Sequence, residues 1–326
     1  MMNNQDNRFS SVELCAGAGG QALGLEQAGF SHEALIEIEK PACNTLLHNR
    51  PEWNVLNMDL RDFSGTPYKG VDLVAGGVPC PPFSKAGKQL GAKDERDLFP
   101  EAVRIADEVR PKAILLENVR GFLDDVFADY RNKLKSKLKK LGYAVDWKLL
   151  NASDFGVSQL RPRVAIVAVQ KQYADTFAWP EPGLIKPKTV GELLYDLMAE
   201  DGWRGAKTWM ERADDIAPTL VGGSKKHGGP DLGPTRARKA WASLGVDGSN
   251  VVYDPPERDF VGMPRLTVKM TARVQGFPDE WHITGKKTPA YRQIGNAFPP
   301  PVARAVAEKV FECLSVSNIF KLSKSA

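Results

Sequence analysis

The chain has 326 residues, 42% of them apolar and 26% charged, so its composition excludes a low-complexity disordered protein. It lacks a run of about 20 apolar residues, and we therefore expect no membrane contact. The net charge of +4 excludes a histone-like or acidic-tail protein and selects no partner by itself. By length alone, two domains are expected.

The N-terminal segment has no basic stretch followed by an apolar core, so we expect no secretory signal and a cytoplasmic location. The four cysteines (Cys15, Cys43, Cys80 and Cys313) lie far apart without a Cys-x-x-Cys pair. This spacing argues against a disulfide framework and a structural zinc site, and we expect no metal. A reactive cysteine here would act as a thiol.

Short β-branched runs alternate with helical patterns in the first half of the chain. We expect buried strands over 11–15, 34–38, 71–76, 113–117, 144–150 and 163–169. Helices are expected between them, over 19–29, 40–48, 98–110 and 126–141. In the last of these, KLKSKLKK is interpreted as a solvated face whose leucines pack inward. The alternation predicts an α/β fold with a mostly parallel sheet covered by helices on both faces.

From about residue 176 to 290 the periodicity fades, and we expect an irregular inserted domain of loops and short strands. The following PPVARAVAEKVFECL is an amphipathic helix expected to pack back onto the sheet. We therefore assign 1–190 and 290–326 to the main domain and 191–289 to the insert.

Gly17, Gly19 and Gly20 lie between a predicted strand and a predicted helix, where glycines allow a tight turn close to a ligand. Glu37 and Asp59 follow the next strands, and an acid at the end of the second strand holds a ribose diol in doubly wound folds. The pattern favours nucleoside binding. Dinucleotide oxidoreductases share this layout, so the cofactor remains open at this point.

Cys80 follows the strand VDLVAGG and is flanked by Pro79, Pro81 and Pro82, which restrict the backbone around it. The carboxyl ends of parallel strands face the ligand crevice, so this thiol is expected to point toward the cofactor.

At this point the chain resembles a DNA (cytosine-5) methyltransferase of the bacterial restriction-modification type. The matching motifs occur in the family's order: VELCAGAGG, GGVPCPPFS, LLENVRGF, LNASDFGVSQLRPRVAIVAV, RLTVKMTARVQGFPDEW and YRQIGNAFPPPVARAVAE. They cover nearly the whole chain except about 176–262. The resemblance implies a Rossmann-like, class I S-adenosylmethionine-dependent methyltransferase fold with a smaller target-recognition domain.

The resemblance also implies the chemistry. The thiolate of Cys80 would add to carbon-6 of a flipped-out cytosine, which activates carbon-5 toward the methyl group of S-adenosylmethionine. Glu117 would contact the ring nitrogen and exocyclic amine of the base. Arg161 and Arg163 would hold its carbonyl side and lower the pKa of the thiol.

By the same resemblance, the cofactor contacts follow the first, second and fourth strands and recur in the last motif. Cys15 stands where the family usually has Phe, so we expect a changed contact to adenine. The expected cofactor-binding residues are Cys15, Ala16, Gly17, Gly19, Gly20, Glu37, Ile38, Asp59, Gly77, Pro79, Leu98, Asn296 and Ala297.

Double-stranded DNA is the expected partner. The segment after Cys80 is glycine-containing and basic, and we expect it to close over the base. Residues 222–240 contain five basic side chains and one acidic one. Their net charge of +4 equals the net charge of the whole chain. This stretch has no helical period, so loops are expected to contact phosphates there. The expected DNA-binding residues are Ser84, Lys88, Thr219, Leu220, Lys225, Lys226, Arg236, Arg238 and Lys239.

Three alternatives stay open: an RNA (tRNA) cytosine-5 methyltransferase of the same fold, a catalytically dead DNA-binding paralogue, and a nicotinamide-dependent oxidoreductase. The oxidoreductase hypothesis assigns no role to the sequences PCPPFS and ENV. We expect a monomer, and a restriction endonuclease that acts on the same sequence without contacting this chain.

Overall fold

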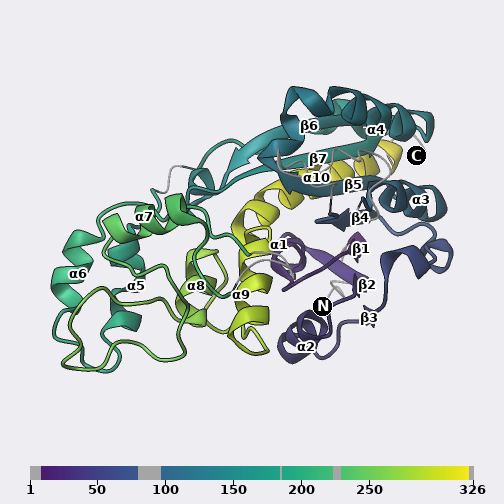
Figure 1. Cartoon of the computed structure of the whole chain (residues 1–326). Helices are drawn as coiled ribbons and strands as arrows, with labels where there is room; N and C mark the ends of the chain where they lie inside the picture. Colours follow the sequence, from purple (N-terminus) through teal and green to yellow (C-terminus); the bar gives the residue numbers. More distant parts are fainter. Residues whose placement is uncertain (1–8, 80–96, 184–185, 223–228, 323–326) are drawn as a thin grey trace, which may run out of the picture.

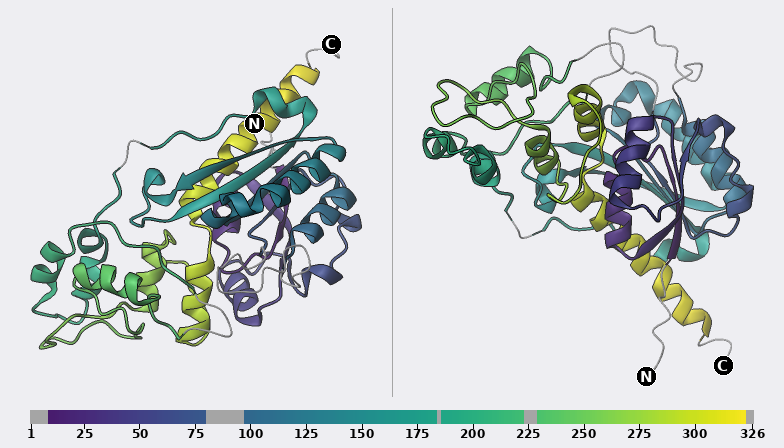
Figure 2. Two further views of the ribbon diagram at one scale, coloured as in Figure 1. Left: turned by 45° about the horizontal axis from the view of Figure 1, so that its top comes forward. Right: turned by 90° about the horizontal axis from the view of Figure 1, so that it is seen from below.

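The computed structural model describes residues 9–79, 97–183, 186–222 and 229–322. A lobe built around a β-sheet adjoins a smaller helical lobe, and α9 (Lys287–Asn296) lies between them (Figures 1 and 2). Among the described residues, no helix combines the length and apolar character that a membrane crossing requires.

The sheet has seven strands in the order β3-β2-β1-β4-β5-β7-β6. Neighbouring strands are parallel except at β7, which pairs antiparallel with both β5 and β6. The mostly parallel sheet is therefore confirmed. The strands are β1 (Phe9–Leu14), β2 (Phe30–Glu37), β3 (Val55–Asn57), β4 (Leu73–Gly76), β5 (Ala113–Val119), β6 (Tyr143–Asn151) and β7 (Pro162–Gln170).

Helices cover both faces of the sheet because successive strand residues point to opposite sides. On β5, Leu115 packs with α1 (Gly20–Gln27) and α10 (Pro300–Leu322), whereas Ile114 and Leu116 pack with α3 (Phe99–Val109) and α4 (Ala128–Lys140). The four helices expected in the first half are therefore present, including α2 (Lys40–Asn49).

Two expectations about individual helices are confirmed. In α4, Leu134 and Leu138 are buried while the lysines between and after them lie toward solvent. In α10, Val302, Val306 and Val310 pack against the sheet and α1, which returns the end of the chain to the first lobe (Figure 2).

The insert differs from the expected loops and short strands, because its described part is mainly helical. Its helices are α5 (Val190–Met198), α6 (Ala206–Arg212), α7 (Thr235–Ser243) and α8 (Val268–Val274). In the residues of the insert that the structure describes, β-pairing is limited to isolated bridges, such as Val252 with Thr267. Buried tryptophans, including Trp209 and Trp241, provide a common core for these short helices.

Candidate active site

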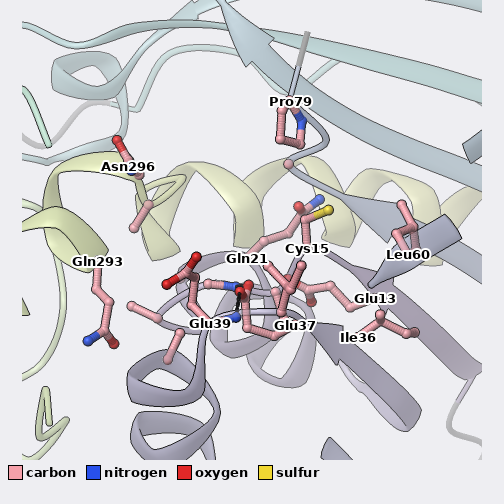
Figure 3. A pocket seen from close by; sticks show the side chains of 18 of the residues that line it. Glu13, Cys15, Gln21, Ile36, Glu37, Glu39, Leu60, Pro79, Gln293 and Asn296 are labelled. Atoms are coloured by element: carbon pink, nitrogen blue, oxygen red, sulfur yellow. Dashed lines mark hydrogen bonds between the residues drawn. The ribbon is translucent and has the colours of Figure 1, made fainter. Parts of the chain in front are cut away.

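A cavity of about 600 Å³ opens at the carboxyl ends of β1, β2 and β4, facing α9 (Figure 3). Its walls come from segments that lie almost 300 residues apart in sequence, from Glu13 to Phe298. Twelve of the thirteen residues that we expected to bind the cofactor line this cavity: Cys15, Ala16, Gly17, Gly20, Glu37, Ile38, Asp59, Gly77, Pro79, Leu98, Asn296 and Ala297.

The glycine-rich turn has the backbone that the sequence predicts. Gly17 has a φ of 55° and Gly19 a φ of 80°, which most residues avoid. A Cβ on Gly20 would lie 2.3 Å from the Phe298 carbonyl oxygen, so this turn approaches the segment after α9 very closely. Cys15 also has a positive φ, of 54°, directly after β1.

Gly19 is the exception among the expected cofactor residues, because it does not line the cavity. A Cβ there would lie 2.7 Å from a methyl carbon of Leu46 and 2.8 Å from the ring of Trp281. Glycine is therefore required at position 19 for two reasons: a side chain would collide with its neighbours, and the positive φ disfavours other residues. The sequence pattern does not separate these roles from ligand contact.

Glu37 ends β2 and is buried in the cavity wall. Its Oε2 accepts a hydrogen bond from the Gly17 amide at 2.8 Å, and its Oε1 accepts one from the Glu39 amide at 2.7 Å. Burial raises the pKa of Glu37, and the two backbone donors oppose this rise. A carboxylate fixed in this way can accept further hydrogen bonds from a pair of ligand hydroxyls.

The cavity contains two further buried acceptors that the sequence reasoning missed, Glu13 on β1 and Gln21 on α1. Glu13 Oε2 and Gln21 Oε1 have no hydrogen-bond partner among the described residues. Burial raises the pKa of Glu13 well above its usual value. In the sequence VEL, Glu13 stands between two apolar residues of a predicted buried strand. An acid at such a position was the sequence signal that could have identified it as a site residue. The two acceptors favour a ligand that carries donors and positive charge.

Ile38, a largely exposed apolar side chain, lines the cavity, as does Cys15. Asp59 also lines the cavity, but its carboxylate already pairs with Arg61 at 2.6 Å. The Arg61 hydrogen bonds hold the pKa of Asp59 below its usual value. Burial, followed by the charge of Glu37, raises the pKa of Cys15, so this thiol stays protonated.

Glu117 lies near the end of β5 and lines the cavity as well. Its Oε1 lies 2.8 Å from Arg163 Nε in an ion pair whose side chains are about nine-tenths buried. Burial raises the pKa of Glu117, and the charges of Arg163 and Arg161 counteract this effect. The carboxyl group is therefore closer to carrying a proton at neutral pH than an exposed glutamate, which suits a proton donor.

Arg161 corrects an expectation. Its side chain is fully buried and hydrogen-bonds to the carbonyl oxygens of Leu220 at 2.8 Å, Gly295 at 2.6 Å and Ala297 at 3.1 Å. A guanidinium enclosed by these backbone acceptors does not reach a base beside Arg163. The RPR spacing places alternate residues on one face of a strand, but only tertiary packing distinguishes Arg163, which pairs with Glu117 at the cavity, from Arg161, which is enclosed by backbone acceptors.

Cys80, Ser84 and Lys88 lie outside the described residues, as do Lys225 and Lys226. The described chain stops at Pro79 and resumes at Asp97. The Leu98 amide donates to the Pro79 carbonyl oxygen at 3.1 Å, and both residues line the cavity. The chain directly before Cys80 therefore lies at the cavity that also contains Glu117.

Expectations for the insert are corrected in two places. The Leu220 side chain is buried in the hydrophobic core and cannot contact DNA, whereas Thr219 is half-buried and donates to the Leu160 carbonyl oxygen. Arg236, Arg238 and Lys239 lie on helix α7 and not in a loop, and all three are exposed.

The mostly parallel sheet, the glycine turn and a cavity at the strand ends define a Rossmann-like fold of the nucleoside-binding class. The chain itself matches the family model for C-5 cytosine-specific DNA methylase over residues 9–312. It therefore belongs to the C-5 cytosine-specific DNA methylases and is an enzyme of that family.

Two curated relatives agree with this assignment. The type II methyltransferase M.NgoMIV of Neisseria gonorrhoeae is 59% identical over 314 residues, which cover 95% of this chain and 100% of that protein. The type II methyltransferase M.NaeI of Lentzea aerocolonigenes is 55% identical over 94% of this chain and 76% of that protein.

The fold agrees with solved structures at low sequence identity. A putative DNA modification methyltransferase encoded within an Escherichia coli prophage superposes with a TM-score of 0.68 at 23% identity, covering 94% of this chain and 99% of that one. DNMT2 of Spodoptera frugiperda gives a TM-score of 0.64 at 20% identity, covering 93% of this chain and 99% of that one.

Proposed function

We propose that this enzyme transfers the methyl group of S-adenosylmethionine to carbon-5 of a cytosine within a specific double-stranded DNA sequence. The observation that carries the proposal is one continuous cavity lined by the glycine turn, Glu37 and Glu117. A nucleoside site and a buried acid thus share one space, as direct transfer to a base requires.

The cavity residues fit S-adenosylmethionine. Glu37 would hold the ribose hydroxyls, with the adenine between Ile38 and the Cys15 wall. Glu13 Oε2 and Gln21 Oε1, which have no hydrogen-bond partner within the described part of the chain, would face the ammonium end of the cofactor. When bound, the cofactor supplies a methyl group on a sulfonium centre.

The base chemistry would be done by residues of this chain. Cys80 thiolate adds to carbon-6 of the cytosine, and Glu117 holds a proton at the ring nitrogen so that the ring accepts the added electrons. Carbon-5 then takes the methyl group and loses its proton to a water molecule. The electron pair that is released re-forms the double bond between carbon-5 and carbon-6, and the bond from carbon-6 to the Cys80 sulfur breaks, which returns the thiolate. Arg163 fixes the Glu117 carboxylate at 2.8 Å, which orients it for this task.

The cytosine must leave the DNA stack before Cys80 can reach carbon-6. The segment that contains Ser84 and Lys88 would close over the extruded base, and the insert would read the sequence around it. Thr219 and the basic side chains of α7 are its candidate DNA contacts, together with Lys225 and Lys226.

Double-stranded DNA is favoured over RNA as substrate because the family model and the curated relatives describe DNA and type II methyltransferases. The name type II also supports a restriction endonuclease that acts on the same sequence without contacting this chain.

The test is methylation of plasmid DNA by the purified enzyme, followed by bisulfite sequencing. We expect conversion-resistant cytosines at one recurring sequence. Cys80→Ser should remove methyl transfer and leave S-adenosylhomocysteine binding intact. Cys313→Ser makes the same change at a buried position of α10 and should behave like wild type. Methyl incorporation by the Cys80→Ser enzyme would disprove the nucleophile assignment.

A further inference from the structure

A buried polar cluster lies where the insert meets the cofactor cavity. It consists of three fully buried side chains, Gln159, Arg161 and Gln275, and we call it the buried junction. Its members come from the approach to β7 and from the end of α8. Fully buried polar side chains require partners, and here those partners belong to distant segments of the chain.

The buried junction holds the segment 217–222 of the insert. Gln159 Oε1 accepts from the Leu220 amide at 2.9 Å, and Arg161 donates to the Leu220 carbonyl oxygen at 2.8 Å. The Leu160 amide donates to the Ala217 carbonyl oxygen at 2.8 Å. The position of this segment is therefore set by hydrogen bonds to the approach to β7.

The same junction holds the wall of the cofactor cavity. Arg161 donates to the carbonyl oxygens of Gly295 at 2.6 Å and Ala297 at 3.1 Å, and Gln275 donates to that of Ala297 at 2.5 Å. Ala297 and its neighbour Asn296 line the cavity at the end of α9. One guanidinium thus connects the insert to the cavity wall.

A close backbone crossing reinforces this connection. A Cβ on Gly295 would lie 2.4 Å from Gly222 Cα, and a Cβ on Gly222 would lie 2.5 Å from Asn296 Oδ1. Segment 217–222 therefore presses directly on α9, which lies between the two lobes (Figure 1). A shift of this segment displaces Asn296, because well-packed contacts leave no room for slippage.

We propose that the buried junction and the Gly222–Gly295 crossing couple DNA binding by the insert to cofactor binding in the cavity. Arg161 is then a positioning residue that acts through Ala297. DNA that fixes segment 217–222 also fixes Asn296 and Ala297, so each ligand tightens the binding of the other by the same factor. The inference rests on the proposed function, since it assumes both ligands.

The experiment measures the Kd of S-adenosylhomocysteine with and without a saturating duplex cut from plasmid that the enzyme methylates. The ratio of the two values is the coupling factor. We expect a factor of about 5 or more for wild type and a factor near one for Gly222→Ala, whose Cβ should also displace Asn296 and so raise the Kd measured without DNA. At saturating DNA, Gly222→Ala should raise KM for the cofactor more than it lowers kcat.

Gly229→Ala is the matched control, because a Cβ there would contact nothing within 4 Å, and it should keep the wild-type factor. If Gly222→Ala does not fold, Gln275→Met tests the same link by removing the hydrogen bond to Ala297. A wild-type factor of one, or an unchanged factor in the variant that folds, overturns the inference. Wild-type enzyme that methylates no DNA overturns the proposed function instead.

Discussion

At the scale of single residues, the cavity contains buried carboxylates in three different states. Glu37 is held by two backbone amides, Glu117 is paired with Arg163, and Glu13 Oε2 has no partner among the described residues. A buried charge is costly until something neutralises it. Glu13 therefore destabilises the free protein and becomes favourable when a cationic ligand group binds.

Replacing Glu13 by Gln should separate stability from binding. Burial raises the pKa of Glu13, so above the unfolded value of about 4.3 the native state binds the extra proton and stability falls as pH rises. The variant lacks this pH-dependent loss, so at neutral pH its Tm without ligand should exceed that of wild type. Its Kd for S-adenosylhomocysteine should rise about tenfold or more.

Glu33→Gln on the exposed part of β2 is the control and should change neither quantity. Thermal melting from pH 5 to 8 measures the expected change in Tm, and titration with S-adenosylhomocysteine measures the expected change in Kd. Tighter binding by the Glu13→Gln enzyme would contradict the assignment of Glu13 to a cationic group.

Glu117→Gln should leave ligand binding nearly unchanged and lower methyl transfer about 100-fold to 10,000-fold. The amide keeps the size of the side chain but cannot pass a proton to the base, and it loses the ion pair with Arg163. Single-turnover incorporation of labelled methyl groups measures the effect. Glu312→Gln, an exposed change on α10, should match wild type; near-normal turnover by Glu117→Gln would exclude proton transfer by this residue.

At the scale of elements, helix α7 gives the basic side chains of the insert a fixed geometry. Arg236 and Lys239 are three residues apart and lie on one face of the helix. Arg238 points elsewhere, since its Cγ lies 3.2 Å from where a Cβ on Gly248 would be. Two of the three cations therefore form a paired basic surface, which we propose as a contact for DNA phosphates.

The double variant Arg236→Gln/Lys239→Gln should bind duplex DNA more weakly and lower the slope of log K against log salt by about 2. Lys137→Gln/Lys139→Gln on α4 removes the same charge from the solvated face of another helix and should preserve the slope. Titrations of each variant with duplex DNA at several salt concentrations measure the two slopes. Equal slopes for both variants would remove α7 from the DNA interface.

At the scale of the whole molecule, the cavity joins distant parts of the chain. Its walls include the glycine turn after β1 and the end of α9. Trp281, which precedes α9 in the chain, donates to the Ala18 carbonyl oxygen at 2.9 Å and so connects the glycine turn to the segment before that helix. A ligand in this cavity would contact the glycine turn and the end of α9 at once. Binding should therefore stabilise the fold as a whole and not one lobe alone.

S-adenosylhomocysteine at 100 times its Kd should add about 2.7 kcal/mol to the free energy of unfolding. For a chain of this size the Tm should rise by several degrees in a single transition. Differential scanning fluorimetry over a ligand series checks this value. Adenosine alone should give a smaller shift, because it lacks the ammonium group assigned to Glu13; equal shifts for both ligands would contradict that assignment.

Local patterns in the sequence determined much of this protein. Six of the seven strands, the four early helices and α10 follow from apolar periodicity, and about half of the residues that line the cavity follow from the glycine turn and the motifs. The structure of the insert was harder to predict from the sequence, because its short helices depend on a shared tryptophan core. A capping box at Thr189 and Glu192, the sequence TVGE, was the local signal for α5.

The sequence by itself determined the fold class, the family and three acids of the cavity, Glu37, Asp59 and Glu117, because these depend on spacings along one strand or turn. Tertiary structure alone decided that Arg161 is enclosed, that Leu220 belongs to the core and that Gly19 serves packing. The physical reason is that burial depends on atoms contributed by distant segments. Arg161 finds its acceptors at Leu220, Gly295 and Ala297, which no local spacing reveals.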